Sequence, residues 1–197
     1  GMSHRVNGEI ALPGSDVEYQ KLTYDAQAYF PLAKDFVLRG YGKLGYGNDL
    51  PFYKNFYAGG FGSVRGYDNS TLGPKYPGVT YNERKTKDYD PEEVGGNALI
   101  QFGTELALPV PFKGDWARQI RPVIFAEGAQ VFDTDCSTAT GDLYLDGSKT
   151  PINAKQYCKD NNDFDFGNMR YSVGVGFTWI TMIGPLSLSY AFPLNDK

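Results

Sequence analysis

Long apolar runs are absent from this sequence. Its 197 residues contain no stretch of about 18 apolar residues, and therefore no candidate transmembrane helix. No secretory signal is visible either; we expect the natural chain to begin upstream, so this says nothing about the compartment. Histidine occurs once and cysteine twice. His4 alone cannot build a catalytic triad or a zinc site.

Basic charge is also scarce. The chain has 19 lysines and arginines against 23 aspartates and glutamates, a net charge of -4, whereas nucleic-acid binders carry a basic face. The glycine-rich stretch at 59–66 lacks the spacing of a phosphate-binding loop, and no G-x-S-x-G or H-E-x-x-H motif occurs. The aspartates of 133–168 do not follow the EF-hand spacing. We therefore expect no enzyme activity, no cofactor, no metal and no nucleic-acid partner.

Alternation of apolar and polar residues is what the sequence has in abundance. In 20–30 one face carries Leu22, Tyr24, Ala26, Ala28 and Phe30, and the other face is largely polar. Segments 169–181 and 185–193 alternate in the same way. The pattern predicts seven strands, at 4–12, 19–30, 36–46, 97–108, 120–132, 169–181 and 185–193.

The composition of the two faces of the predicted strands distinguishes a soluble β-sandwich from a transmembrane β-barrel. A soluble antiparallel sandwich would carry charged residues on its solvent face. In 169–181 and 185–193, however, the polar face is mostly glycine, serine and alanine, and the apolar face is partly aromatic. Lipid outside, a lumen inside and aromatic girdles at the interfaces fit these faces better. The apolar face comprises Met169, Tyr171, Val173, Val175, Phe177, Trp179, Leu186, Leu188, Tyr190 and Phe192.

The links between strands differ in length at the two ends. Shorter links are 31–35, 109–119 and 182–184, whereas 13–18, 47–96 and 133–168 lie at the other end. Short periplasmic turns and long extracellular loops are typical of transmembrane barrels. We therefore predict an all-β fold, an antiparallel up-and-down meander over residues 1–197 that forms part of a transmembrane β-barrel. Its long extracellular loops would be 47–96 and 133–168.

The predicted barrel is incomplete. Seven strands are an odd number, below the usual minimum of about eight, and the chain stops at Lys197 after a Pro-Leu-Asn-Asp turn. A closed barrel pairs its last strand with its first. We expect a C-terminal barrel piece without the final strand, whose open edges and apolar face make it need detergent or self-associate.

The densest motif is the segment 56–67, Phe-Tyr-Ala-Gly-Gly-Phe-Gly-Ser-Val-Arg-Gly-Tyr. Its glycines permit a tight fold-back, and Arg65 needs carboxylate partners if it is enclosed. Alternation places Glu105 on the inner face of its strand. Glu127 is the lone carboxylate among the apolar and small residues of its predicted strand, and a charge that faced lipid there would be costly. We expect both carboxylates to point inward and to pair with Arg65.

Val64-Arg65-Gly66-Tyr67 resembles the V-R-G-[FY] signature of the extracellular loop that enters the barrel in the BamA superfamily. Segments 69–74, 94–98 and 184–186 are similar to that family in the same order. The resemblance implies a sixteen-stranded barrel in the bacterial outer membrane, about seven of whose strands are present here. It also implies that acidic residues of the inner wall hold the motif arginine, and Glu105 and Glu127 fall at those positions.

The function implied by the resemblance is that of an insertase, which folds β-barrel proteins and inserts them into the outer membrane. Its partners would be outer-membrane lipid, unfolded client proteins and, through periplasmic domains absent from this chain, the lipoproteins of the assembly machinery. A TamA-like assembly protein and a two-partner secretion transporter stay open, because both carry the motif. A passive porin is the alternative from another class.

Cys136 and Cys158 both lie in the predicted extracellular loop 133–168, and no other cysteine occurs. An outer-membrane loop passes through an oxidising compartment, which favours a disulfide. The alternative is two free thiols.

Overall fold

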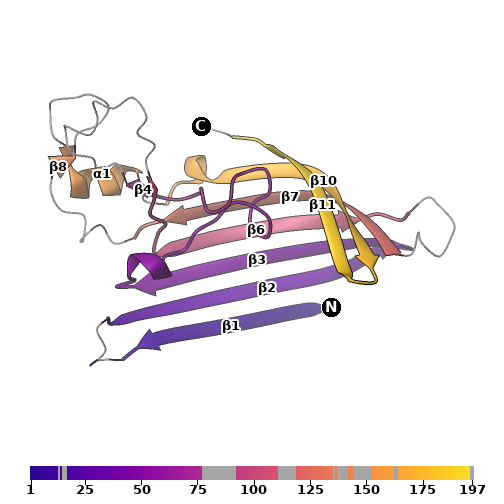
Figure 1. Ribbon diagram of the computed structural model, residues 1–197, viewed down its shortest axis with the longest axis horizontal. Coiled ribbons are helices and arrows are strands. Elements are labelled where there is room, and N and C mark those ends of the chain that lie inside the picture. The colour runs from indigo at the N-terminus through magenta and orange to yellow at the C-terminus, as the bar shows by residue number, and fades with distance from the viewer. Residues whose placement is uncertain are drawn as a thin grey trace.

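A single antiparallel sheet dominates the structure, a computed structural model that describes residues 1–12, 14, 17–76, 92–110, 119–134, 136, 142–143, 152–161 and 164–195. Within these residues seven strands pair in the order β1-β2-β3-β6-β7-β10-β11, which is the order of the chain (Figure 1). Their bounds are β1 Met2–Ala11, β2 Tyr19–Ala33, β3 Phe36–Asn48, β6 Ala98–Ala107, β7 Ile120–Phe132, β10 Arg170–Thr181 and β11 Gly184–Pro193. The predicted meander and all seven predicted strands are confirmed.

The two faces of the sheet follow the alternation of the sequence. Register pairs Val175 of β10 with Tyr190 of β11, so these side chains share one face and remain 54% and 65% exposed. We call this the outer face, and the face covered by the segment 49–76 the inner face. The prediction that Met169 belongs to the apolar outer face was wrong. Its side chain is buried, because the residue lies before β10 and directly after a 3-10 helix at Phe166–Asn168.

The links differ at the two ends as expected (Figure 1). β10 and β11 join through Met182 and Ile183. β2 and β3 join through Lys34 and Asp35, a shorter turn than the predicted 31–35, because β2 continues past an irregularity after Pro31. Much of the long loops and of the predicted links 13–18 and 109–119 lies outside the described residues.

Short elements punctuate the long loops. The first loop holds a 3-10 helix at Phe52–Lys54 and the paired strands β4 (Lys75–Tyr76) and β5 (Glu92–Glu93). The second holds β8 (Asp142–Leu143), β9 (Ile152–Asn153) and α1 (Ala154–Asn161). The helix α1 was not predicted. No helix among the described residues is long and apolar enough to cross a membrane.

The hydrophobic core lies between the first long loop and the inner face of β6 and β7. Phe56, Ala58, Val64 and Leu72 of the loop pack with Leu99, Ala129 and Val131 of the strands. The sheet makes room for the loop at Gly45 of β3, where a Cβ atom would lie 2.5 Å from the Phe56 ring. The core is thus made by docking the loop onto the sheet and not by a second sheet.

Exposed edges and an apolar outer face predict association of the 197-residue chain in water. Within the described residues β1 pairs only with β2, and β11 only with β10. Unpaired edges invite strand addition, and the outer face exposes side chains such as Trp179 at 42% and Leu188 at 64%. Light scattering in detergent-free buffer should report oligomers, and detergent should disperse them. A monomer that binds no hydrophobic dye would contradict this assignment of the outer face.

Candidate functional site: the inner-face arginine cluster

The loop reaches the inner face through a tight fold-back. Ala58 and Leu72 form an isolated antiparallel bridge, and the Gly60 N–H donates to the Val64 carbonyl at 3.1 Å. The glycines of the fold-back adopt the positive φ angles that glycine tolerates best: Gly59 (107°), Gly60 (82°), Gly62 (92°) and Gly66 (93°). The fold-back buries Val64 completely and aims the next side chain at the sheet.

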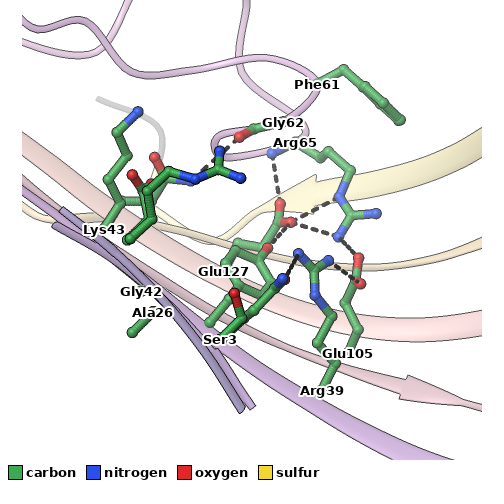
Figure 2. A pocket seen from close by; sticks show the side chains of 15 residues that line it. Ser3, Ala26, Arg39, Gly42, Lys43, Phe61, Gly62, Arg65, Glu105 and Glu127 are labelled. Atoms are coloured by element: carbon green, nitrogen blue, oxygen red, sulfur yellow. Dashed lines mark hydrogen bonds and ion pairs between the residues drawn. The ribbon is translucent and has the colours of Figure 1, made fainter. Parts of the chain in front are cut away.

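Arg65 forms ion pairs with both predicted carboxylates, Glu105 and Glu127 (Figure 2). Its Nη2 donates to Glu127 Oε1 at 2.5 Å and to Glu105 Oε1 at 2.6 Å, and its Nε donates to Glu127 Oε1 at 2.9 Å. The backbone N–H of Arg65 donates to the other oxygen of Glu127 at 2.8 Å. The guanidinium carbon sits 3.5 Å from the centre of the Phe125 ring. The structure therefore brings together the residues that the sequence singled out.

These groups are well shielded from solvent. The side chain of Glu127 is 3% exposed, that of Arg65 11% and that of Glu105 18%. Burial lowers the pKa of Arg65, but the hydrogen bonds and charges of Glu127 and Glu105 raise it by more, so its pKa lies above the usual value. The guanidinium stays charged at any physiological pH. Arg65 therefore serves this site as a fixed positive charge.

β3 supplies two further partners, which the sequence analysis missed. Arg39 Nη1 donates to Glu105 Oε2 at 2.9 Å, and its Nη2 to Gln27 at 3.1 Å. Tyr41 Oη donates to Glu127 Oε1 at 2.5 Å. Register explains the first contact, because Arg39 stands directly opposite Glu105. Alternation along β3 puts both side chains on the inner face, and this signal could have found them.

Beside the cluster lies a cavity of about 400 Å³ on the inner face. Charges of both signs line it: in the register of the sheet Arg5 of β1 and Lys43 of β3 each stand opposite Asp25 of β2. In the described part of the chain no group of three or more His, Cys, Asp or Glu side chains could hold a metal ion. The chemistry that this site offers is electrostatic fastening of a loop.

The rest of the motif contacts the last two strands. Gly66 has a φ of 93°, and a Cβ atom there would lie 3.2 Å from the Cβ of Ala191 on β11. Tyr67 Oη donates to the Tyr171 carbonyl of β10 at 3.0 Å. The motif thus spans the sheet from β6 to β11.

Cys136 and Cys158 form the expected disulfide, with a Cα–Cα distance of 5.8 Å. Both side chains are buried, and Cys158 lies in α1. The bridge fastens α1 to the start of the second long loop, next to the end of β7. It is remote in sequence from the arginine cluster, and we assign it a structural role.

An apolar exterior, a polar interior and a loop fastened inside by an arginine define the wall of a membrane β-barrel. The Omp85 superfamily domain matches residues 1–197. The chain belongs to the Omp85 superfamily and is part of an outer-membrane barrel, as the sequence analysis predicted.

Its relatives include the outer membrane protein assembly factor BamA of Neisseria meningitidis, 38% identical over 98% of this chain and 24% of that protein. The sorting and assembly machinery component 50 homolog of Mus musculus is 29% identical over 99% of this chain and 37% of that protein. The crystal structure of BamA from Haemophilus ducreyi lacking POTRA domains 1-3 matches with a TM-score of 0.77 and 30% identity, over 100% of this chain and 36% of that one. The chain therefore spans about a quarter to just over a third of these relatives, and the resemblance to the BamA family is confirmed.

Replacing Arg65 by alanine should lower the free energy of unfolding by about 3 kcal/mol, because it leaves Glu127 and Glu105 buried without their main counter-charge. Urea unfolding in detergent measures the difference. Arg121→Ala is the matched control, since this arginine lies on β7 with an exposed side chain. Equal stabilities of the two variants would mean that the ion cluster does not hold the loop.

Thiol titration of the unreduced, denatured protein should detect no free cysteine, and titration after reduction should detect both. Reduction should also destabilise the second loop by about 3 kcal/mol, because the bridge closes a loop of moderate size. Protease nicking near α1 before and after reduction measures this change. Two reactive thiols in the unreduced protein would contradict the bridge.

Proposed function

We propose that this chain is the part of an outer-membrane insertase in which the arginine loop braces the barrel wall while other β-barrel proteins are folded and inserted. One observation carries the proposal: Glu105 and Glu127 hold Arg65 inside a sheet, in a chain that is 38% identical to a BamA protein over 98% of its own residues. We place the activity in backbone pairing and not in covalent chemistry.

The proposed mechanism follows from what a β-sheet edge can do. An unpaired edge strand presents a row of N–H and C=O groups, to which an incoming strand can add. Such templating needs a wall that keeps its curvature while the edge opens and closes. The loop supplies that stiffness here, because its core residues and its arginine contact several neighbouring strands at once. The proposed clients are unfolded outer-membrane proteins.

The proposed partners follow from the same activity. The outer face would contact outer-membrane lipid through its aromatic and aliphatic side chains. Lipoproteins of the assembly machinery would bind through periplasmic domains elsewhere in the whole protein. A passive pore is less suited to this structure, because the segment 56–72 packs against the inner face and occupies space that a pore would keep open.

The test uses the full-length protein in lipid vesicles and follows the folding of a urea-unfolded client barrel by its heat-modifiable mobility on gels. The wild type should speed folding over empty vesicles. Arg65→Ala should reduce this gain severalfold, because the loop loses the ion pairs that hold it to the wall, and Arg121→Ala should leave it intact.

Planar-bilayer recordings complete the test. An insertase with the loop docked should give little steady current. A large, steady, ion-selective current together with no gain in client folding would overturn the proposal and favour a porin.

A further inference from the structure

The side chain of Asn195 joins the segment after β11 to the arginine loop. Asn195 follows the end of β11 at Pro193, and its amide meets both the start of β10 and Tyr67 of the motif. Asn195 is separated in sequence from Tyr67 by 128 residues and from Tyr171 by 24. The contact is therefore a tertiary one, made only when loop and sheet are both in place.

Both the oxygen and the nitrogen of the Asn195 amide form hydrogen bonds. Its Oδ1 accepts from the Tyr171 N–H at 2.9 Å and from Tyr67 Oη at 3.2 Å, and its Nδ2 donates to the Met169 carbonyl at 2.5 Å. The backbone N–H of Tyr171 and the carbonyl of Met169 fix the orientation of the Asn195 amide, since an N–H can only donate and a carbonyl can only accept. The oxygen that faces Tyr67 is thus set by the β10 backbone.

The backbone around Asn195 is held to the same strand. The N–H of Leu194 donates to the Tyr171 carbonyl at 2.9 Å, and Arg170 Nη1 donates to the Asn195 carbonyl at 2.7 Å. The single hydroxyl proton of Tyr67 is shared between the Tyr171 carbonyl at 3.0 Å and Asn195 Oδ1 at 3.2 Å. The Tyr67 hydroxyl therefore lies between two acceptors, the Tyr171 carbonyl and the Asn195 side-chain oxygen, and the second belongs to the segment 194–195.

We propose that Asn195 is a positioning residue, a latch that holds Tyr67 against β10 and thereby keeps Arg65 on Glu105 and Glu127. Only Gly66 separates Tyr67 from Arg65, and Gly66 lies so close to β11 that a Cβ atom there would be 3.2 Å from the Cβ of Ala191. A shift of Tyr67 must therefore be taken up by the Arg65 backbone, whose N–H is bonded to Glu127. Through this chain of contacts the segment after β11 controls whether the arginine loop is docked.

Hydrogen exchange tests the latch, because the Arg65 amide is bonded to Glu127 but has no contact with Asn195 in the described structure. In the full-length protein in lipid, Asn195→Ala and Tyr67→Phe should each speed exchange at Arg65 about fivefold, the loss of one hydrogen bond. The double variant should exchange no faster than the faster single variant, since Tyr67→Phe already removes the hydroxyl through which Asn195 acts on the loop. Asn168→Ala, an exposed asparagine of the neighbouring segment, is the control and should match the wild type.

The outcomes separate a latch from general stabilisation. Peptides from β6 serve as the internal reference and should keep wild-type exchange. Unchanged exchange at Arg65, an equal rise throughout β6, or single effects that multiply in the double variant would overturn the proposal. Should Asn195→Ala fail to fold, Asn195→Ser carries the test, because its shorter side chain withdraws the amide oxygen from Tyr67 while the Tyr67 hydroxyl keeps its hydrogen bond to the Tyr171 carbonyl. The readout does not depend on insertase activity, so the latch and the proposed function can fail separately.

Discussion

A carboxylate enclosed on the inner face of the sheet is the constraint on which the rest of this structure depends. Glu127 sits in the middle of β7, and its side chain is 3% exposed. A charge so placed is costly unless hydrogen bonds and an opposite charge surround it. The Arg65 backbone, the Arg65 guanidinium and Tyr41 all donate to it. The Glu127 carboxylate therefore gains its opposite charge only when the loop is inside.

This pairing fixes position more than it adds stability. Ion pairs in a shielded site gain little over well-packed apolar residues, whereas breaking one is expensive. The cluster accordingly penalises every arrangement in which Arg65 is elsewhere. Glu105 shows how tightly the charges are matched, since it is shared between Arg65 at 2.6 Å and Arg39 at 2.9 Å. Two guanidinium groups thus face two carboxyl groups.

The sequence predicted the sheet well, because alternation is a local property: a residue's face follows from its neighbours two positions away. The same rule gave Glu105 and Glu127, once a lipid-facing charge is excluded. Alternation along β3 places Arg39 on the inner face, but its pairing with Glu105 depends on the register between β3 and β6, which alternation does not specify. Asn195 was missed for a stronger reason: its contacts are to backbone groups and to a loop residue, and no periodicity encodes them. Helix α1 lies in a loop without a clear periodic pattern.

The loop also makes contacts beyond the arginine cluster, and their placement explains why it can act as a brace. At the β1 side, Lys54 of the loop pairs with Glu9, and Lys21 of β2 donates to the Lys54 carbonyl at 2.5 Å. At the other side, Tyr67 is bonded to β10. Strands β1 and β10 are not neighbours in the sheet. A single segment of chain thus ties together strands that backbone pairing cannot join directly, and a change in the curvature of the sheet must strain or release its contacts on at least one side.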